Sequence, residues 1–295
     1  MASHIRATWK ETSDWIFTTG DNHTTAEAVE FHNLGAQDYY VDMNTDLNYF
    51  ETGIVAQFGT LSCLSLYMHN KDGKFAGFSR TAIRGNRGWL GGICLAPEFR
   101  GRGGGSLLFE EYVNLLRERA SIKTLQFECI AQNTRALTMY GKFGCEIKGD
   151  LITYTTELQD FEPAPGGLTM TTSDRIDLRS PWLQHTTNYP WQREFSVLLA
   201  GPHEQYRFTL DGEVVLELAV DATRNPVRID GIAYQQRPTP ERLTEAIRMM
   251  SKSLSKTKFR VSNEPSDSDV TPLLEAVLKR EELYQKALVL RMDHK

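Results

Sequence analysis

The residues best placed to do chemistry form one glycine-rich run. Arg100-Gly101-Arg102-Gly103-Gly104-Gly105-Ser106 stands between an apolar segment that ends at Pro97 and an amphipathic segment that begins at Ser106. Glycines let backbone N–H groups face a ligand without a Cβ in the way, and a helix N-terminus adds its dipole. This pattern favours binding of a phosphate or pyrophosphate, to which the two arginines would add charge. The alternative is that the glycines only make a tight turn.

Two common nucleotide-binding motifs do not fit this run. A Walker loop requires a lysine followed by Ser or Thr after the glycines, and Ser106 stands where a dinucleotide-binding fingerprint requires its third glycine. Phosphoryl transfer would further require a lysine and an Mg²⁺-holding hydroxyl at the right spacing. The run is therefore a poor candidate for a nucleotide site.

The elements around the run predict a mixed sheet with helices. Apolar patterning and turn residues predict short helices, then three antiparallel strands, then a helix, a strand, a helix and one or two final strands. These elements span residues 23–40, 44–58, 61–68, 75–83, 89–95, 106–119, 125–130, 133–143 and 146–158. We expect Thr24 to cap the first helix and Gly144 to end the last. The fold class is α/β with a mixed (α+β) sheet, not a regular strand–helix alternation.

Composition excludes several classes of protein. The 295 residues are 40% hydrophobic and 24% charged, and 33 Lys and Arg against 38 Asp and Glu leave a net charge of −5. This composition predicts about two globular domains, without nucleic acid as the main partner. No apolar run is long enough for a membrane span or a secretory leader, so a cytoplasmic location is expected. The four cysteines lack metal-ligand spacing and are interpreted as reduced core thiols, with no metal site.

The second half reads as a weak copy of the first. Two prolines and two glycines within residues 160–167 predict a linker, which gives domains 1–160 and 161–295. The later elements follow the same order at residues 206–210, 214–220, 227–234, 239–254, 258–262, 270–278 and 288–292. The loop at 235–240 has no glycine and two prolines, which remove N–H donors, so a second phosphate site is not expected there. The alternative for this half is an unrelated α+β domain.

Two motifs in order carry a resemblance to a known family. Arg100-Gly101-Arg102-Gly103-Gly104-Gly105, and Asn133-x-x-Ala136-x-x-x-Tyr140-x-x-Phe143-Gly144 downstream, are similar to the GNAT (Gcn5-related) N-acetyltransferase superfamily. The resemblance covers about residues 55–158. It implies two GNAT-like domains in tandem, with the cofactor machinery in the first and a degenerate second copy.

The resemblance implies a role for each matching residue. The amides of Gly101 to Gly105 and Ser106, with Arg100 and Arg102, would hold the pyrophosphate of acetyl-CoA. Ile93 and Leu95 would pair with the pantetheine arm, and the Leu95 amide would stabilise an oxyanion. Asn133 would anchor the arm or cap its helix. Tyr140 would be the general acid, its alternative being a core aromatic.

The sequence offers more than one candidate for the general base. Strand alternation puts Glu128 on one face of strand 125–130, beside the expected cleft, so it is our candidate; its alternative is a surface ion pair. Glu98 is a weaker candidate because it would serve to position the turn. Cys94 has no basic neighbour in the sequence and is better read as an inert core thiol.

The sequence therefore predicts an acyl-CoA-dependent N-acyltransferase. We expect transfer of acetyl to a primary amine of a small molecule or peptide, by direct attack in a ternary complex, with the protein a monomer or homodimer. The alternative is a non-catalytic acyl-CoA-binding or sensing protein. An acidic run from Asp38 to Asp46 could form the wall of the acceptor groove. The aromatic segment 180–193 could also reach the acceptor, or only pack the interior.

Overall fold

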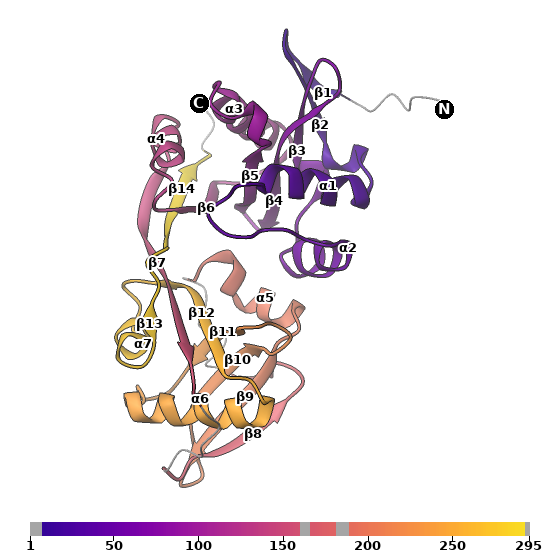
Figure 1. Cartoon of the computed structure of the whole chain (residues 1–295). Coiled ribbons are helices and arrows are strands. Elements are labelled where there is room, and N and C mark those ends of the chain that lie inside the picture. Colours follow the sequence, from indigo (N-terminus) through magenta and orange to yellow (C-terminus); the bar gives the residue numbers. More distant parts are fainter. Residues whose placement is uncertain (1–7, 160–165, 181–188, 293–295) are drawn as a thin grey trace. The chain divides into compact units, whose positions relative to one another are not determined.

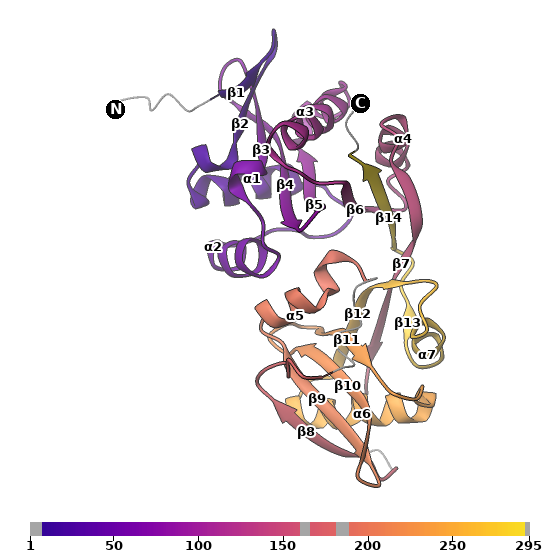
Figure 2. The same cartoon turned by 180° about the vertical axis from the view of Figure 1, so that it is seen from behind.

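The chain folds into two compact units. The computed structural model describes residues 8–159, 166–180 and 189–292, shown from two sides in Figures 1 and 2. Unit 1 comprises Met1–Glu128, Arg135–Glu146 and Leu288–Lys295, and unit 2 comprises Cys129–Thr134 and Ile147–Ala287. The chain passes from unit 1 to unit 2 at Glu128/Cys129, returns at Thr134/Arg135 and passes again at Glu146/Ile147. The division predicted from the sequence, at residues 160/161, lies outside the described residues.

Unit 1 is a mixed sheet covered by helices. Its strands, in spatial order, are β1 (Thr8–Glu11), β2 (Trp15–Thr19), β3 (Leu66–Asn70), β4 (Phe75–Arg84), β5 (Arg87–Leu95), β6 (Thr124–Ile130) and β14 (Gln285–Arg291). Neighbours from β1 to β5 are antiparallel, and β5 and β6 are parallel. The helices are α1 (Thr25–Ala36), α2 (Leu47–Tyr49), α3 (Gly104–Arg119) and α4 (Thr134–Lys142), and a π-helical segment follows α2 at Phe50–Gln57.

Local sequence signals explain several of these elements. Thr24 and Glu27 form a capping box at the start of α1, as the sequence predicts. The β3–β4 turn is at Gly73, whose φ of +79° requires glycine. The strand predicted at 61–68 is wrong in its first half, because Ser62–Leu64 form a 3₁₀ turn and β3 begins only at Leu66. Cys63 in that turn is exposed, which corrects its interpretation as a core thiol.

The end of the chain completes unit 1. The sequence assigns residues 288–292 to the close of the second copy, and a strand does form there as β14. From Leu288 onward, however, this strand belongs to unit 1, where the Met292 N–H donates to the Lys123 carbonyl oxygen at 2.8 Å. Leu288, Leu290 and Met292 are buried at 2–6% exposure. Unit 1 is therefore built from both ends of the sequence.

Unit 2 repeats the arrangement with its own core. Its sheet has the order β7 (Glu146–Glu157), β12 (Lys258–Pro265), β11 (Val227–Ala233), β10 (Glu213–Asp221), β9 (Glu204–Leu210) and β8 (Thr169–Ser173), and β13 (Lys279–Arg280) also pairs with β7. The helices are α5 (Phe195–Ala200), α6 (Pro240–Leu254) and α7 (Thr271–Val277). Helix α6 lies against this sheet (Figure 2). Its apolar residues Leu243, Ile247 and Met250 belong to the core of the unit.

Across the described residues, the helices are too short or too polar to cross a lipid bilayer.

Candidate active site

The glycine-rich run forms an open turn at the start of α3. Gly103 is the N-cap of α3 with φ +83°, and Gly101 has φ +88°, so both positions require glycine. The cap offers no side-chain acceptor, and the first turn of α3 has no acidic residue. Apart from its neighbours along the chain, no described residue comes within 4 Å of a Cβ placed on Gly103. The N-terminus of α3 is thus without a side-chain cap, and its dipole favours an anion at Gly104 and Gly105, while the Ser106 N–H already donates to the Gly103 carbonyl oxygen at 3.0 Å.

The three arginines near this turn differ in what they contact. Arg100 donates from Nε to the Leu95 carbonyl oxygen at 2.9 Å and from Nη2 to the Gly35 carbonyl oxygen at 3.1 Å, so it ties β5 to the end of α1. Arg102 is exposed. Arg135, which the sequence analysis missed, is exposed on α4, and its Nη2 lies 4.0 Å from a Cβ built on Gly101. Arg102 and Arg135 are thus better placed to meet an anion than Arg100.

Strand β5 stays paired with β4 to Leu95 but separates from β6, which leaves the edge of β5 toward β6 unpaired beyond Trp89 in the described part of the chain. The two strands pair only at Arg87, Gly88 and Trp89 within the described residues, and they diverge beyond that point. The Ala96 N–H donates to the Ala76 carbonyl oxygen across β4. Because successive peptide groups point to opposite edges of a strand, the amides of Ile93 and Leu95 point toward the gap. Both residues are half-buried there, as the predicted pantetheine edge requires.

Glu128 lies where β5 and β6 begin to diverge. Its Oε2 accepts a hydrogen bond from Trp89 Nε1 at 3.0 Å. Trp89 is opposite Gln126 in the register, so Trp89, Gln126 and Glu128 share one face of the sheet. The Phe58 ring, next to the π-helical segment, contacts Trp89 on that face at 5.7 Å. Glu128 is half-buried, and this hydrogen bond holds its carboxylate on the face of β6 that carries Trp89.

Tyr140 lies on the opposite face of β6. Its ring packs edge-on against Phe127 at 4.7 Å and against Phe109 of α3 at 5.1 Å, and the residue is 5% exposed. Phe127 alternates with Glu128 along β6, so the predicted acid and the predicted base are on different sides of the strand. The ring packing alone is also what a core aromatic would show.

The remaining predicted residues have individual placements. Asn133 directly precedes α4 and its N–H donates to the Ile130 carbonyl oxygen at 2.9 Å. Glu98 accepts from Lys74 Nζ at 2.7 Å on the surface, which is a positioning contact. Burial raises the pKa of the Cys94 thiol to about 11, so it stays protonated at neutral pH and is a poor nucleophile. Asp46 accepts from the Tyr49 N–H and caps α2.

Comparison with known proteins agrees with this geometry. Residues 30–145 match the model of the acetyltransferase (GNAT) family. This part of the chain is a GNAT domain. It contains the glycine-rich turn, the free edge of β5, Glu128 and Tyr140.

The whole chain has the fold of tandem GNAT proteins. A tandem GNAT protein from the clavulanic acid biosynthesis pathway superposes over 95% of this chain and 99% of its own, with 13% identity and a TM-score of 0.67. A GCN5-related N-acetyltransferase from Sphaerobacter thermophilus does so over 95% and 96%, with 14% identity and a TM-score of 0.67. No curated protein sequence matches the chain. GNAT proteins as a class bind acyl-CoA and act on amine acceptors.

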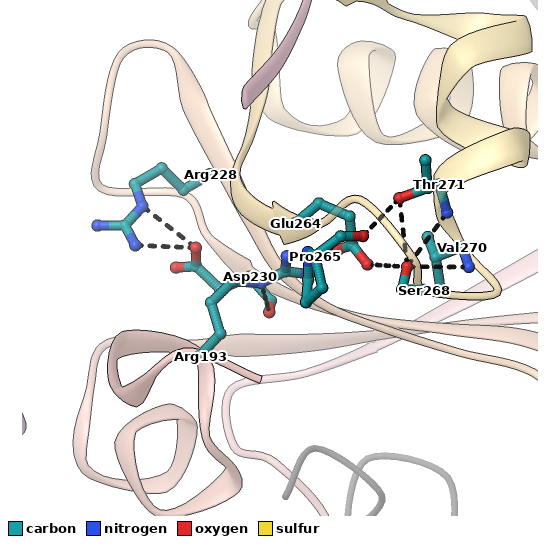
Figure 3. A network of polar contacts seen from close by, with 8 residues as sticks. All are labelled: Arg193, Arg228, Asp230, Glu264, Pro265, Ser268, Val270 and Thr271. Carbon is teal, nitrogen blue, oxygen red and sulfur yellow. Dashed lines mark hydrogen bonds and ion pairs between the residues drawn. The ribbon is translucent and has the colours of Figure 1, made fainter. Parts of the chain in front are cut away.

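Unit 2 has the corresponding strand gap, but a side chain fills it. β11 and β12 pair at Val227 and Arg228 and then diverge. Arg193, 1% exposed, bridges them: Nε donates to the Asp230 carbonyl oxygen of β11 at 2.8 Å, and Nη1 donates to Glu264 Oε2 of β12 at 2.5 Å (Figure 3). The guanidinium thus binds the Asp230 carbonyl oxygen and fills the space between the strands, both of which a pantetheine arm would need.

The helix that follows the gap in unit 2 is also closed to an anion. Thr239 caps α6 by accepting from the Arg242 N–H, and Glu241 brings a negative charge into the first turn. The corresponding helix of unit 1, α3, has neither feature. These contacts oppose anion binding at α6, in line with the prediction from the sequence, which rests on two prolines and the lack of glycine in the loop 235–240. Within the aromatic segment, Trp191 is fully buried and Tyr189 lies 4.6 Å from Arg193, while residues 181–188 are outside the described residues.

Replacing Gly103 by glutamate is expected to abolish acetyl-CoA binding. Two like charges about 4 Å apart near a protein surface repel by about 4 kcal/mol, which corresponds to roughly a 10³-fold loss of affinity. Calorimetric titration with acetyl-CoA measures this loss of affinity. Gly73→Glu is the matched control, because Gly73 has nearly the same φ (+79°) and equally open surroundings but lies in the β3–β4 turn. Equal affinities in the two variants would contradict an anion site at α3.

Proposed function

We propose that this protein is an acetyl-CoA-dependent N-acetyltransferase whose single cofactor site is in unit 1. The uncapped N-terminus of α3, beside the free edge of β5, is the observation that carries the proposal. The amides of Gly101, Gly103, Gly104 and Gly105 would hold the pyrophosphate, together with the side chains of Ser106, Arg102 and Arg135. Arg100 is a positioning residue in this account, because its guanidinium orients the end of β5.

In the proposed reaction, the general base and the general acid act from opposite faces of β6. The amides of Ile93 and Leu95 would orient the pantetheine arm, and the Leu95 amide would also stabilise negative charge on the thioester oxygen. Glu128 would accept a proton from the acceptor ammonium, on the face that carries Trp89. Tyr140, on the other face, would donate a proton to the departing thiolate. Acetyl-CoA supplies the acyl group, and the acceptor is a primary amine of a small molecule or peptide.

The proposal is tested by release of CoA thiol from acetyl-CoA in the presence of a panel of primary amines. Release with at least one amine, abolished by Gly103→Glu, supports it. Binding of acetyl-CoA without release for any amine would favour the alternative of an acyl-CoA-binding sensor. The burial of the Tyr140 ring between two phenylalanines is the observation that favours this second function. The monomer or homodimer state and the cytoplasmic location remain predictions from the sequence.

Replacing Tyr140 by phenylalanine is expected to lower kcat by about 100-fold or more, since loss of a general acid costs that much. The affinity for acetyl-CoA should not change, because the ring packing is kept. Steady-state thiol release and calorimetry measure the two quantities. Tyr112→Phe is the control: Tyr112 is equally buried in unit 1 and its hydroxyl accepts from Thr81 at 2.9 Å. Equal kcat values in the two variants would mean that Tyr140 is only a core aromatic and not the general acid.

A further inference from the structure

Unit 1 contains a buried arginine, Arg80, that pairs with no carboxylate among the described residues. Arg80, on β4, is 5% exposed. Its Nη1 donates to His32 Nδ1 at 2.8 Å and its Nη2 to the Gly91 carbonyl oxygen at 3.3 Å, while Nε is buried without an acceptor in the structure. The Phe78 ring lies 5.0 Å from the guanidinium carbon. All of these partners are neutral or aromatic.

The titratable neighbours do not supply a negative charge either. His32 Nε2 lies 2.6 Å from the Met43 carbonyl oxygen and must be its donor, which leaves Nδ1 as the acceptor for Arg80. Burial and the Arg80 charge lower the pKa of His32 to about 4, so this ring is neutral at pH 7. Burial raises the pKa of Tyr67 to about 12 and that of Cys94 to about 11. Burial lowers the pKa of Arg80 itself, but a guanidinium stays protonated in proteins, so Arg80 is a cation without a counter-ion among the described residues.

Such a charge is costly unless an anion joins it. An ion in a protein interior without a partner costs several kcal/mol of desolvation. Arg193 of unit 2 is the internal contrast, since it is as deeply buried but pairs with the carboxylate of Glu264. Arg193 is thus neutralised by a carboxylate of the same chain, whereas Arg80 has no such carboxylate among the described residues. A carboxylate on a bound ligand would supply the counter-ion that Arg80 lacks.

Arg80 also lies on the face of the sheet that carries Trp89, the partner of the predicted base. It is opposite Gly92 in the β4–β5 register, at a bulge where β5 carries one extra residue, and its Nη2 lies 3.0 Å from a Cβ built on Gly92. Its side chain is covered by His32 of α1 and by Phe50, whose ring is 5.9 Å away. The π-helical segment that contributes Phe50 ends next to Phe58, which contacts Trp89, the partner of Glu128. Arg80 and the predicted base thus share a face of the sheet.

We propose that Arg80 determines acceptor specificity and that the acceptor is an amine bearing a carboxylate, for which the Arg80 guanidinium is the counter-ion. The inference rests on the proposed function and narrows its substrate class. A carboxylate suits this position because its two oxygens can accept from the planar N–H groups of one guanidinium. An uncharged amine would leave the buried cation unpaired.

Matched acceptors test the proposal in the wild-type protein. Free amino acids, β-alanine and 4-aminobutyrate are each compared with their carboxamides as acceptors in the thiol-release assay. Loss of a hydrogen bond to a charged group is worth about 1.5–3 kcal/mol, so the acids should exceed the amides in kcat/KM by about 10–100-fold. Arg80→Gln should erase this preference by lowering the value for the acids. Arg80→Lys, which keeps the charge and loses the planar fork, should retain part of it.

A second readout does not depend on turnover or on the stability of a variant. The Nε–H resonance of Arg80 in the wild type, assigned by its absence from Arg80→Lys, should shift when the acids are added and stay fixed with the amides. A shift with acids but no thiol release would support the carboxylate site and overturn the proposed transfer. Equal rates for acids and amides with an unmoved resonance would leave the transfer standing and overturn this inference. Neither release nor shift would overturn both.

Discussion

A chain that ends at Ala287 is expected to lose the folded state of unit 1 and, with it, all binding of acetyl-CoA. The truncation removes Leu288, Leu290 and Met292, which are buried in unit 1. Burial of each such side chain contributes about 1.5–3 kcal/mol, so the loss is comparable to the whole stability of a typical domain, about 5–15 kcal/mol. Near-UV circular dichroism and acetyl-CoA titration measure the effect. For the same reason, residues 1–160 alone should not fold into an active unit.

Two aspartate variants in the same strand distinguish the loss of buried packing from the effect of a shorter chain. Leu290→Asp puts a charge into a site that is 6% exposed, whereas Arg291→Asp puts the same charge on the exposed neighbour. The first should destabilise unit 1 by more than about 3 kcal/mol, and the second should have little effect. If a chain ending at Ala287 binds acetyl-CoA as tightly as the full chain, the assignment of the last strand to unit 1 is wrong.

Replacing Arg193 by methionine is expected to lower the free energy of unfolding of unit 2 by about 3–5 kcal/mol. The substitution leaves Glu264, which is fully buried, without its cation, and breaking one side of a buried ion pair costs that much. It also removes the donor to the Asp230 carbonyl oxygen, so the two strands that Arg193 bridges lose their link. Urea unfolding of the purified variant measures the change.

Arg179→Met is the control for the loss of a charged pair as such. Arg179 pairs with Asp177 at 3.2 Å, but its side chain is 91% exposed. Exposed pairs contribute about 0–1 kcal/mol, so this variant should unfold almost as the wild type does. If Arg193→Met were as stable as Arg179→Met, the Arg193 side chain would not be the element that fills the gap between β11 and β12.

Local features of both units could be predicted from the sequence. The cap at Thr24 and the helix that follows the glycine-rich run depend on residues that are adjacent in the chain, and both are present, although α3 begins at Gly104 and not at Ser106. The amphipathic pattern of α6 likewise suffices to predict its buried face. The site could be outlined for the same reason, because its turn and the free edge of β5 are consecutive in sequence.

Features that depend on distant partners could not be predicted in this way. An alternating strand such as residues 288–292 does not encode which sheet it joins, so its place in unit 1 was missed. Arg100 looks like a phosphate ligand from its motif, yet its guanidinium contacts the Leu95 and Gly35 carbonyl oxygens. The β1–β2 hairpin lacks a strong alternation and was not predicted. Arg193 and Glu264 are 71 residues apart, and no local pattern joins them.

Calorimetric titration of the whole chain with acetyl-CoA tests the central claim most directly. The uncapped turn at Gly103 and the bridged gap at Arg193 together predict one binding site per chain, and Gly103→Glu should remove it. Two sites would contradict the closure of unit 2 by Arg193. Absence of binding would mean that the glycines only turn the chain, and it would contradict the proposed function itself.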